Sequence, residues 1–447
     1  MTSSSSYVLA VDFGLSTVRA AVVDETGMSF GTAARPSPYS PRSSRHESAD
    51  SWAQAVMDVS AAALAKADKP IERVCVVGIG PVPVLLDGAD NVLDTGWLGQ
   101  VPRGPETSRA GDALSPDHVL PYLLALQHSE PALVTRAASV VDLVGYVVFC
   151  LTGVKSMDQV TAHYYTANES LPVSAATVSL ATSPVGGLSS AAADRLGTEV
   201  GVPVITGTID CFADLGRAGV SRPGDAGLVL GSTLVIGAVG EPRDPFPGLD
   251  ASPHLGEGTW FGGATASAGM SIDWITDLLR VDDAVARRAG ELDPGDLLAL
   301  PYLAGERTPF FDPGARGLLA GLTLETGPEH LYRAMIDGVA VSALDHLDYL
   351  VQSGLQPTRF RATGGGLRNH LLATCVCDAL GLPIDLVPGG LPAAGAAWLA
   401  HQSMGIELAV PVVEVLQPDT RRHRVYEELL VTSRQLWASA GEYIRRS

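Results

Sequence analysis

The feature that most constrains the fold is a pattern that occurs twice in the chain. Residues 7–24 form an apolar run, a turn of acidic, glycine and hydroxyl residues, and a second apolar run; residues 227–240 repeat this layout around residues 231–233. Each pattern predicts a β-hairpin, because valine- and alanine-rich runs separated by a glycine-containing turn are typical of paired strands. Two such hairpins, each heading one half of the chain, predict a duplicated domain.

Other segments extend this prediction to a mixed α/β fold. A helix is expected over residues 46–67, buried strands over 74–80 and 202–210, and a strand, triple glycine, helix and strand over 360–387. Ser48 or Asp50 is the expected N-cap of the first helix. A chain of 447 residues is long enough for two domains. We expect them at residues 1–220 and 221–447, because glycine, proline and charged residues gather near 216–227.

Composition and charge exclude several classes of partner. The formal net charge of −19 and the pI near 4.8 argue against binding to nucleic acid or to an anionic membrane surface, since both require lysine and arginine. No apolar stretch is long enough to suggest a membrane span, and the polar start has no pattern of a signal peptide. Five cysteines without a framework spacing favour a reducing, cytoplasmic location. The oligomeric state stays open, with a homodimer as one alternative.

The turn of the first hairpin carries residues suited to a nucleotide phosphate. A tight turn containing Gly14, Ser16 and Thr17 exposes backbone N–H groups that can hold phosphate oxygens, and Arg19 adds a positive charge nearby. Asp12 cannot bind phosphate directly, because like charges repel, but it can help hold a Mg²⁺ ion between them. The alternative reading of this motif alone is an ordinary hairpin with a solvated arginine.

Three later segments favour the phosphate interpretation. Gly231, Ser232 and Thr233 supply a second phosphate-type turn, and the glycine triplet at 364–366 has the geometry for close approach of a nucleotide. Asp210 directly follows a buried strand, where a carboxylate can accept a proton from a substrate hydroxyl. The alternative role for Asp210 is that of a helix N-cap.

Taken in order, these segments resemble the FGGY carbohydrate kinases, a branch of the actin and Hsp70 ATPase superfamily. The motifs are "DFGLSTVR", "HESADSWAQA", "VPVITGTIDCFADLGRAG", "GLVLGSTLVIGAV", "GERTPFFDPGARGLLAGLT" and "ATGGGLRNHLLATCVCDALGLPIDLV" with "AAGAAWLA". The resemblance covers nearly the whole chain. It implies two ribonuclease-H-like α/β domains flanking a cleft, with ATP and Mg²⁺ as cofactors and a small sugar or polyol as substrate.

The resemblance also implies a role for each motif residue. Asp210 is the expected catalytic base, and Asp12 and Asp210 are the expected metal-binding residues. The residues expected to bind the nucleotide are Gly14, Ser16, Thr17, Arg19, Gly231, Ser232, Thr233, Gly365, Gly366 and Asn369. The sugar side and the catalytic Asp belong to residues 1–220, and the nucleotide side to residues 221–447.

Two departures from the family pattern bear on the substrate. Leu15 stands where the family has threonine, and "VGIGPVPVLLD" replaces the polar sugar-contact motif of the xylulose kinases. Trp97 and Arg103 are partial matches to a second sugar-contact motif, whose aspartate is absent. The pattern around Asp210 resembles the pentulose kinases most, so a ketopentose such as D-xylulose is the expected substrate. The alternatives are another polyol, ketose or aldonate, or a catalytically impaired regulatory protein of the same fold.

Overall fold

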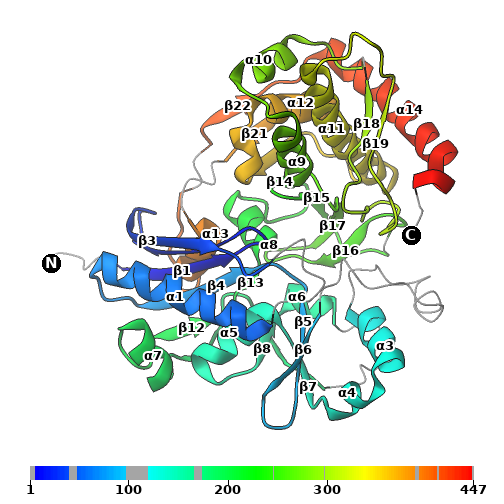
Figure 1. The fold of residues 1–447 in the computed structure, drawn as a ribbon. Helices are drawn as coiled ribbons and strands as arrows, with labels where there is room; N and C mark the ends of the chain where they lie inside the picture. Colours follow the sequence, from blue (N-terminus) through cyan, green and yellow to red (C-terminus); the bar gives the residue numbers. More distant parts are fainter. Residues whose placement is uncertain are drawn as a thin grey trace. The chain divides into compact units, whose positions relative to one another are not determined.

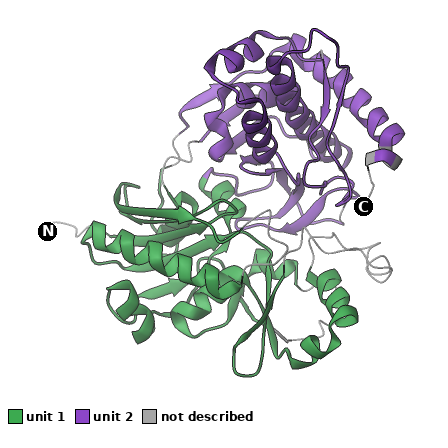
Figure 2. Ribbon diagram, in the orientation of Figure 1, with its two compact units in different colours: residues 1–217, 390–410 green, residues 218–389, 411–447 purple. Residues whose placement is uncertain are grey.

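The computed structural model describes residues 6–39, 48–96, 119–165, 174–244, 246–295, 297–387, 392–409 and 412–444. The chain divides into two compact units (Figure 2). Unit 1 is formed by Met1–Arg217 and Gly390–Val410, and unit 2 by Ala218–Gly389 and Pro411–Ser447. The return of residues 390–410 to unit 1 is a feature that the sequence patterns did not indicate. The predicted division by function, into residues 1–220 and 221–447, stays a prediction.

Unit 1 is built on a seven-stranded sheet in the order β11-β12-β4-β1-β2-β3, with β13 also paired to β4 (Figure 1). The strands are β1 (Val8–Phe13), β2 (Thr17–Val23), β3 (Ser29–Pro36), β4 (Arg73–Gly78), β11 (Pro184–Gly187), β12 (Pro203–Ile205) and β13 (Thr208–Ile209). The first two strands form the predicted antiparallel hairpin, and β1 pairs in parallel with β4. The parallel strands β1 and β4 are almost completely buried, as their continuous apolar runs require.

Unit 2 has a seven-stranded sheet in the order β16-β17-β15-β14-β20-β21-β22. Its strands are β14 (Ala226–Leu230), β15 (Leu234–Gly240), β16 (Asp250–Pro253), β17 (Thr259–Ala264), β20 (Phe360–Thr363), β21 (Ile384–Leu386) and β22 (Glu414–Leu416). The second predicted hairpin is β14 and β15, and β14 pairs in parallel with β20.

The two sheets share one connectivity. In each, an antiparallel hairpin (β1–β2 or β14–β15) continues into a third antiparallel strand (β3 or β17), while its first strand pairs in parallel with a later strand (β4 or β20). A further parallel strand follows on that side, β12 in unit 1 and β21 in unit 2. This common order confirms the predicted duplication and the predicted pair of ribonuclease-H-like α/β domains.

The remaining elements surround these two sheets. In unit 1 they are α1 (Ala49–Ala67), α3 (Val119–Ser129), α4 (Pro131–Arg136), α5 (Leu143–Thr152), α6 (Gln159–His163), α7 (Ser190–Leu196), α8 (Asp210–Arg217), α13 (Ala394–Gln402), β5 (Pro83–Leu86), β6 (Val92–Thr95), β7 (Ser139–Asp142), β8 (Ser156–Asp158), β9 (Ser174–Ala175) and β10 (Thr177–Ser179). In unit 2 they are α9 (Gly269–Leu279), α10 (Asp283–Glu291), α11 (Pro328–Gln352), the 3₁₀ helix η2 (Gly365–Arg368), α12 (His370–Leu380), α14 (Thr420–Ile444), β18 (Leu298–Leu300) and β19 (Leu318–Ala320).

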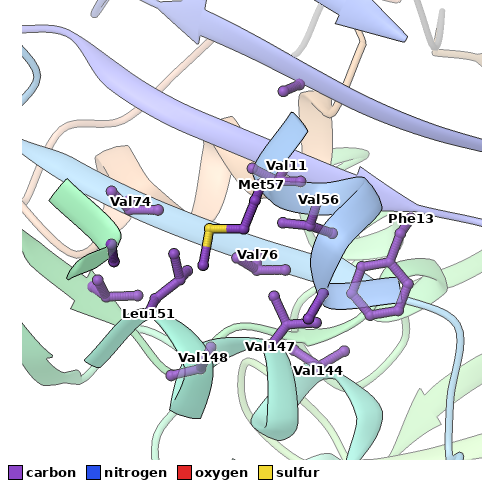
Figure 3. Packing of buried hydrophobic residues seen from close by; sticks show 14 of the residues in the cluster. Val11, Phe13, Val56, Met57, Val74, Val76, Val144, Val147, Val148 and Leu151 are labelled. Carbon is purple, nitrogen blue, oxygen red and sulfur yellow. The ribbon is translucent and has the colours of Figure 1, made fainter. Parts of the chain in front are cut away.

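The core of unit 1 lies between its sheet and the helices α1 and α5. Val56 and Met57 of α1 and Val147 of α5 meet side chains of β1 and β4, such as Val11 and Val76 (Figure 3). Helix α1 begins after Ser48, whose side chain accepts a hydrogen bond from the backbone N–H of Asp50, so the predicted Ser48 cap is confirmed. None of the helices that the structure describes is long and apolar enough to cross a membrane.

The position of β1 in this core predicts a large effect of shortening one of its side chains. Leu9 is completely buried in the core of unit 1. Leu9→Ala removes buried apolar contacts and leaves a cavity, which typically costs about 2–5 kcal/mol. We therefore expect a clearly lower midpoint of thermal unfolding, measured by circular dichroism. Leu180→Ala is the matched control, because Leu180 is 61% exposed and its substitution is expected to leave the midpoint nearly unchanged. Equal midpoints for the two variants would contradict this core assignment.

Candidate functional site

Three parallel strands of unit 1 end at one edge of its sheet. Phe13 of β1 and Ile209 of β13 both pair with Gly78 of β4. The residues that follow these strands therefore emerge side by side: the turn at Gly14 and the first residue of α8, Asp210. Ligands of open α/β sheets bind at the carboxyl ends of the parallel strands. This edge is the candidate site of unit 1.

The predicted phosphate turn is a tight connection between β1 and β2. The backbone N–H of Gly14 donates to the carbonyl of Thr17 at 2.9 Å, which closes the turn, and Ser16 is exposed at its tip. Arg19 lies opposite Asp12 in the β1–β2 register. Leu15 packs against the hydrophobic core. Ser16 and Thr17 follow Leu15 directly and keep their hydroxyl groups in the turn. Leu15 itself contributes to the packing of the core.

Asp210 stands at the first position of α8, at the end of β13. Its Oδ1 accepts a hydrogen bond from the backbone N–H of Cys211 at 2.7 Å. Burial, and next the negative charge of Asp12, raise the pKa of Asp210 to about 7. A carboxyl group with a pKa near neutrality can exchange a proton efficiently at physiological pH. This is a property of a general base that a solvent-exposed helix cap lacks.

Asp12 is also held in surroundings that disfavour its charge. Burial raises its pKa to about 6, and the positive charge of Arg19 opposes this rise. Asp12 and Asp210 come from positions far apart in the sequence, yet the structure places them near enough for their charges to interact. The pair predicted from sequence is therefore brought together within unit 1.

A third carboxylate joins this pair, and sequence reasoning missed it. Asp214 lies one helical turn after Asp210 on α8. Burial, followed by the charges of Asp12 and Asp210, raises its pKa to about 7, while Arg217 and Arg19 act in the opposite direction. The spacing of four residues in "DCFAD" was the available signal, because residues i and i+4 share one face of a helix.

The chemistry of these side chains fits a magnesium ion that is bound mainly by a nucleotide. Within the described ranges, no group of three or more His, Cys, Asp and Glu side chains is arranged to hold a metal ion by itself. Mg²⁺ usually keeps several waters and is bound through one or two carboxylates together with substrate phosphates. Two neighbouring carboxylates, Asp12 and Asp210, next to a phosphate-type turn meet that requirement.

The second predicted phosphate turn lies between β14 and β15 in unit 2. The backbone N–H of Gly231 donates to the carbonyl of Thr233 at 2.9 Å, two residues on, whereas the bond from Gly14 in unit 1 reaches three residues on, to Thr17. The start of α9 is fastened to this turn, since the N–H of Gly269 donates to the carbonyl of Gly231 at 3.1 Å and that of Ala268 to Ser232 at 2.9 Å. The turn and the N-terminus of α9 therefore form one local unit.

The glycine triplet follows β20, beside β14, at the same edge of the unit 2 sheet. Gly364 has a φ of 109°, and a Cβ there would lie 2.4 Å from the carbonyl oxygen of Leu230. Gly366 also packs on Leu230, whereas Gly365 is exposed. Two of the three glycines are thus required by the chain's own packing. Asn369 caps α12, accepting from the N–H of Leu372 at 3.2 Å, so its role toward a nucleotide stays a prediction.

The predicted sugar-contact positions are only partly described. Trp97 and Arg103 lie outside the described residues. After β4 the chain continues through Ile79, Pro81 and Val82, which are buried. A Cβ at Gly80 would lie 2.8 Å from the Ile209 side chain, so this segment packs directly beside the strand that leads to Asp210. The carboxylate of Asp142 also lies near this segment, since its Oδ1 accepts a hydrogen bond from the N–H of Val82 at 2.9 Å, so the effect of the sequence departure on the substrate stays a prediction.

Comparisons with known proteins place the second half of the chain in a family. Residues 230–404 match the model of the "FGGY family of carbohydrate kinases, C-terminal domain". The chain is 31% identical to the xylulose kinase of Escherichia coli over 253 residues, which are 53% of this chain and 52% of the relative. It is 32% identical to a glycerol kinase of Alkalilimnicola ehrlichii over 40% of this chain and 38% of that relative. The chain thus spans about half or less of the length of these curated relatives.

The structural comparison extends over nearly the whole chain. The crystal structure of xylulose kinase from Rhodospirillum rubrum has a TM-score of 0.83 at 26% sequence identity, and the match covers 98% of this chain and 100% of that structure. These findings agree: residues 230–404 carry the C-terminal domain of the FGGY family of carbohydrate kinases, and nearly the whole chain is similar in fold to a xylulose kinase.

Proposed function

We propose that this chain is an ATP-dependent carbohydrate kinase that transfers the γ-phosphoryl group of ATP to a hydroxyl of a small sugar. The observation that carries the proposal is the arrangement at the edge of the unit 1 sheet. There the carboxylates of Asp12 and Asp210 lie within range of each other's charge, next to the phosphate-type turn at Gly14. A proton acceptor, a cation site and a phosphate site are the groups that phosphoryl transfer requires.

Each of these groups has a distinct part in the proposed reaction. Asp210 takes the proton from the attacking sugar hydroxyl, and its raised pKa suits this task. Asp12, with Asp210, holds the Mg²⁺ of the nucleotide; this ion neutralises charge on the phosphates. Backbone N–H groups and hydroxyls of the turn, together with Arg19, orient the phosphate chain. Phosphoryl transfer depends mostly on such positioning and charge neutralisation.

The nucleotide is assigned to unit 2. The support is its phosphate-type turn at Gly231–Thr233 and the glycine-rich segment beside it. In the sheet of unit 2, both follow the strands that correspond to β1 and β4 of unit 1. Ser232, Gly365, Gly366 and Asn369 are proposed to contact the nucleotide. The internal duplication supports this assignment, because one connectivity gives both units a turn of glycine and hydroxyl residues at the corresponding strand end.

A ketopentose such as D-xylulose is the first candidate substrate. Relatives at 31% sequence identity and a solved structure at 26% are named xylulose kinases, and this supports the choice. A curated relative at similar identity is named glycerol kinase, so polyols, other ketoses and aldonates belong in the same test. The segment after β4 lacks the polar motif of the xylulose kinases, so the acceptor is proposed to make fewer polar contacts with this segment.

A single substitution tests the role of Asp210. Asp210→Asn keeps the size of the side chain but removes the proton acceptor, so turnover is expected to fall by about 10²- to 10⁴-fold. Binding of Mg-ATP should change little. The measurement is ADP release over a panel of ketopentoses, polyols and aldonates. Asp194→Asn is the control, because Asp194 is an exposed residue of α7.

The outcomes of this test separate the alternatives. Full activity of Asp210→Asn would remove Asp210 from the mechanism and leave it the role of a helix cap. An inactive wild-type protein on the whole panel would favour the alternative of a catalytically impaired, regulatory member of the family. Partial rescue of the variant by excess Mg²⁺ would assign Asp210 chiefly to the metal.

Nucleotide binding can be tested without turnover. A ligand that binds only the folded state stabilises it by about 2.7 kcal/mol when it is present at a hundredfold excess over its dissociation constant. We therefore expect millimolar Mg-ATP or Mg-ADP to raise the midpoint of thermal unfolding, measured by differential scanning fluorimetry. The same concentration of magnesium chloride alone is the control. An unchanged midpoint with both nucleotides would contradict the assignment of ATP.

A further inference from the structure

Within unit 1, the helices α8 and α13 touch at two glycines. A Cβ at Gly395 would lie 2.9 Å from Oδ1 of Asp214 and 3.0 Å from the carbonyl carbon of Ala213. A Cβ at Gly216 would lie 2.5 Å from the indole ring of Trp398. Contacts this short leave no room for a methyl group. The two helices are therefore packed as closely as their backbones allow.

The carboxylate of Asp214 meets α13 at its first turn. Gly395 is the second residue of α13, which follows Ala393 with a φ of 57°. The start of a helix has free N–H groups and a partial positive charge, both of which favour a negative side chain. Ala393 has no polar side chain to satisfy this end. The side chain of Asp214, which is polar in its charged and its neutral form, reaches this end from the neighbouring helix.

We propose that Asp214 is a positioning residue for the proposed kinase reaction: it braces α8 against the first turn of α13 and so fixes the direction of Asp210. The inference rests on the proposed function. Helix α8 has eight residues, and Asp210 is the first of them, so a small tilt of the helix moves its carboxylate. A displacement of about 1 Å at a reacting group can cost about 10²-fold in rate.

Two substitutions of Asp214 separate positioning from chemistry. Asp214→Ala removes the brace, and kcat is expected to fall by about 10- to 100-fold while KM for Mg-ATP changes by less than about threefold. Asp214→Asn keeps the shape and is expected to retain most of kcat. If Asn is as damaging as Ala, Asp214 takes part in the chemistry through its charge, and the positioning proposal is wrong. Unchanged kcat in Asp214→Ala would equally overturn it.

A substitution on the other side of the contact gives an independent test. Gly395→Ala places a methyl group against Asp214 and Ala213, so it is expected to lower kcat in the same way as Asp214→Ala. Gly290→Ala is the matched control: Gly290 is also a helical glycine, in α10, and its nearest neighbour would be Leu371 at 3.9 Å. Equal kcat in the two glycine variants would contradict the proposal.

Hydrogen exchange supplies a readout that does not depend on turnover. Amide exchange in the peptide covering α8 is expected to rise in Asp214→Ala and Gly395→Ala, and to stay at the wild-type level in Asp214→Asn and Gly290→Ala. The absence of this pattern overturns the positioning role, whether or not the wild type is active. Wild-type protein that shows the exchange pattern but phosphorylates none of the sugars refutes the proposed function and, with it, the assignment of Asp214 to that reaction.

Discussion

The parallel pairing of β4 with both β1 and β13 is the constraint on which the rest of the candidate site depends. It sets Phe13, Gly78 and Ile209 in line, so the segments that follow them emerge at one edge of the sheet. The pairing is held in place by burial, because β4 carries a run of fully apolar residues that the helices α1 and α5 cover. If the pairing register of β4 shifted by one residue, its apolar side chains would point away from the core.

Electrostatics gives this edge its chemical character. Asp12, Asp210 and Asp214 share a partly buried region. Burial raises the pKa of all three, and the charges of neighbouring aspartates add to this rise for Asp210 and Asp214. Arg19 and Arg217 oppose this effect for Asp214. Burying like charges together costs stability, and an opposite charge nearby reduces the cost. A region of this kind is suited to a cation that arrives with a nucleotide, as the proposed function requires.

The sequence predicted the architecture well because its signals are local. The two hairpins, the Ser48 cap and the buried strands each depend on a short pattern, and their repetition indicated the duplication. The return of residues 390–410 to unit 1 depends on contacts between segments far apart in the sequence, such as that of Gly395 with Asp214. No local pattern reports such contacts. The triple glycine is a second example. The sequence pattern predicted that it approaches a nucleotide, but Gly364 and Gly366 are also needed for close packing on Leu230, which no local pattern indicates.

The central claim is that this chain transfers a phosphoryl group from ATP to a sugar, with Asp210 as the base. Mass spectrometry of reaction mixtures containing Mg-ATP and single ketopentoses, polyols or aldonates tests it most directly. The account predicts a sugar monophosphate with at least one of these acceptors for the wild-type protein, and only a trace of it for Asp210→Asn. Release of ADP without any phosphorylated sugar, or equal product from both proteins, would contradict the account.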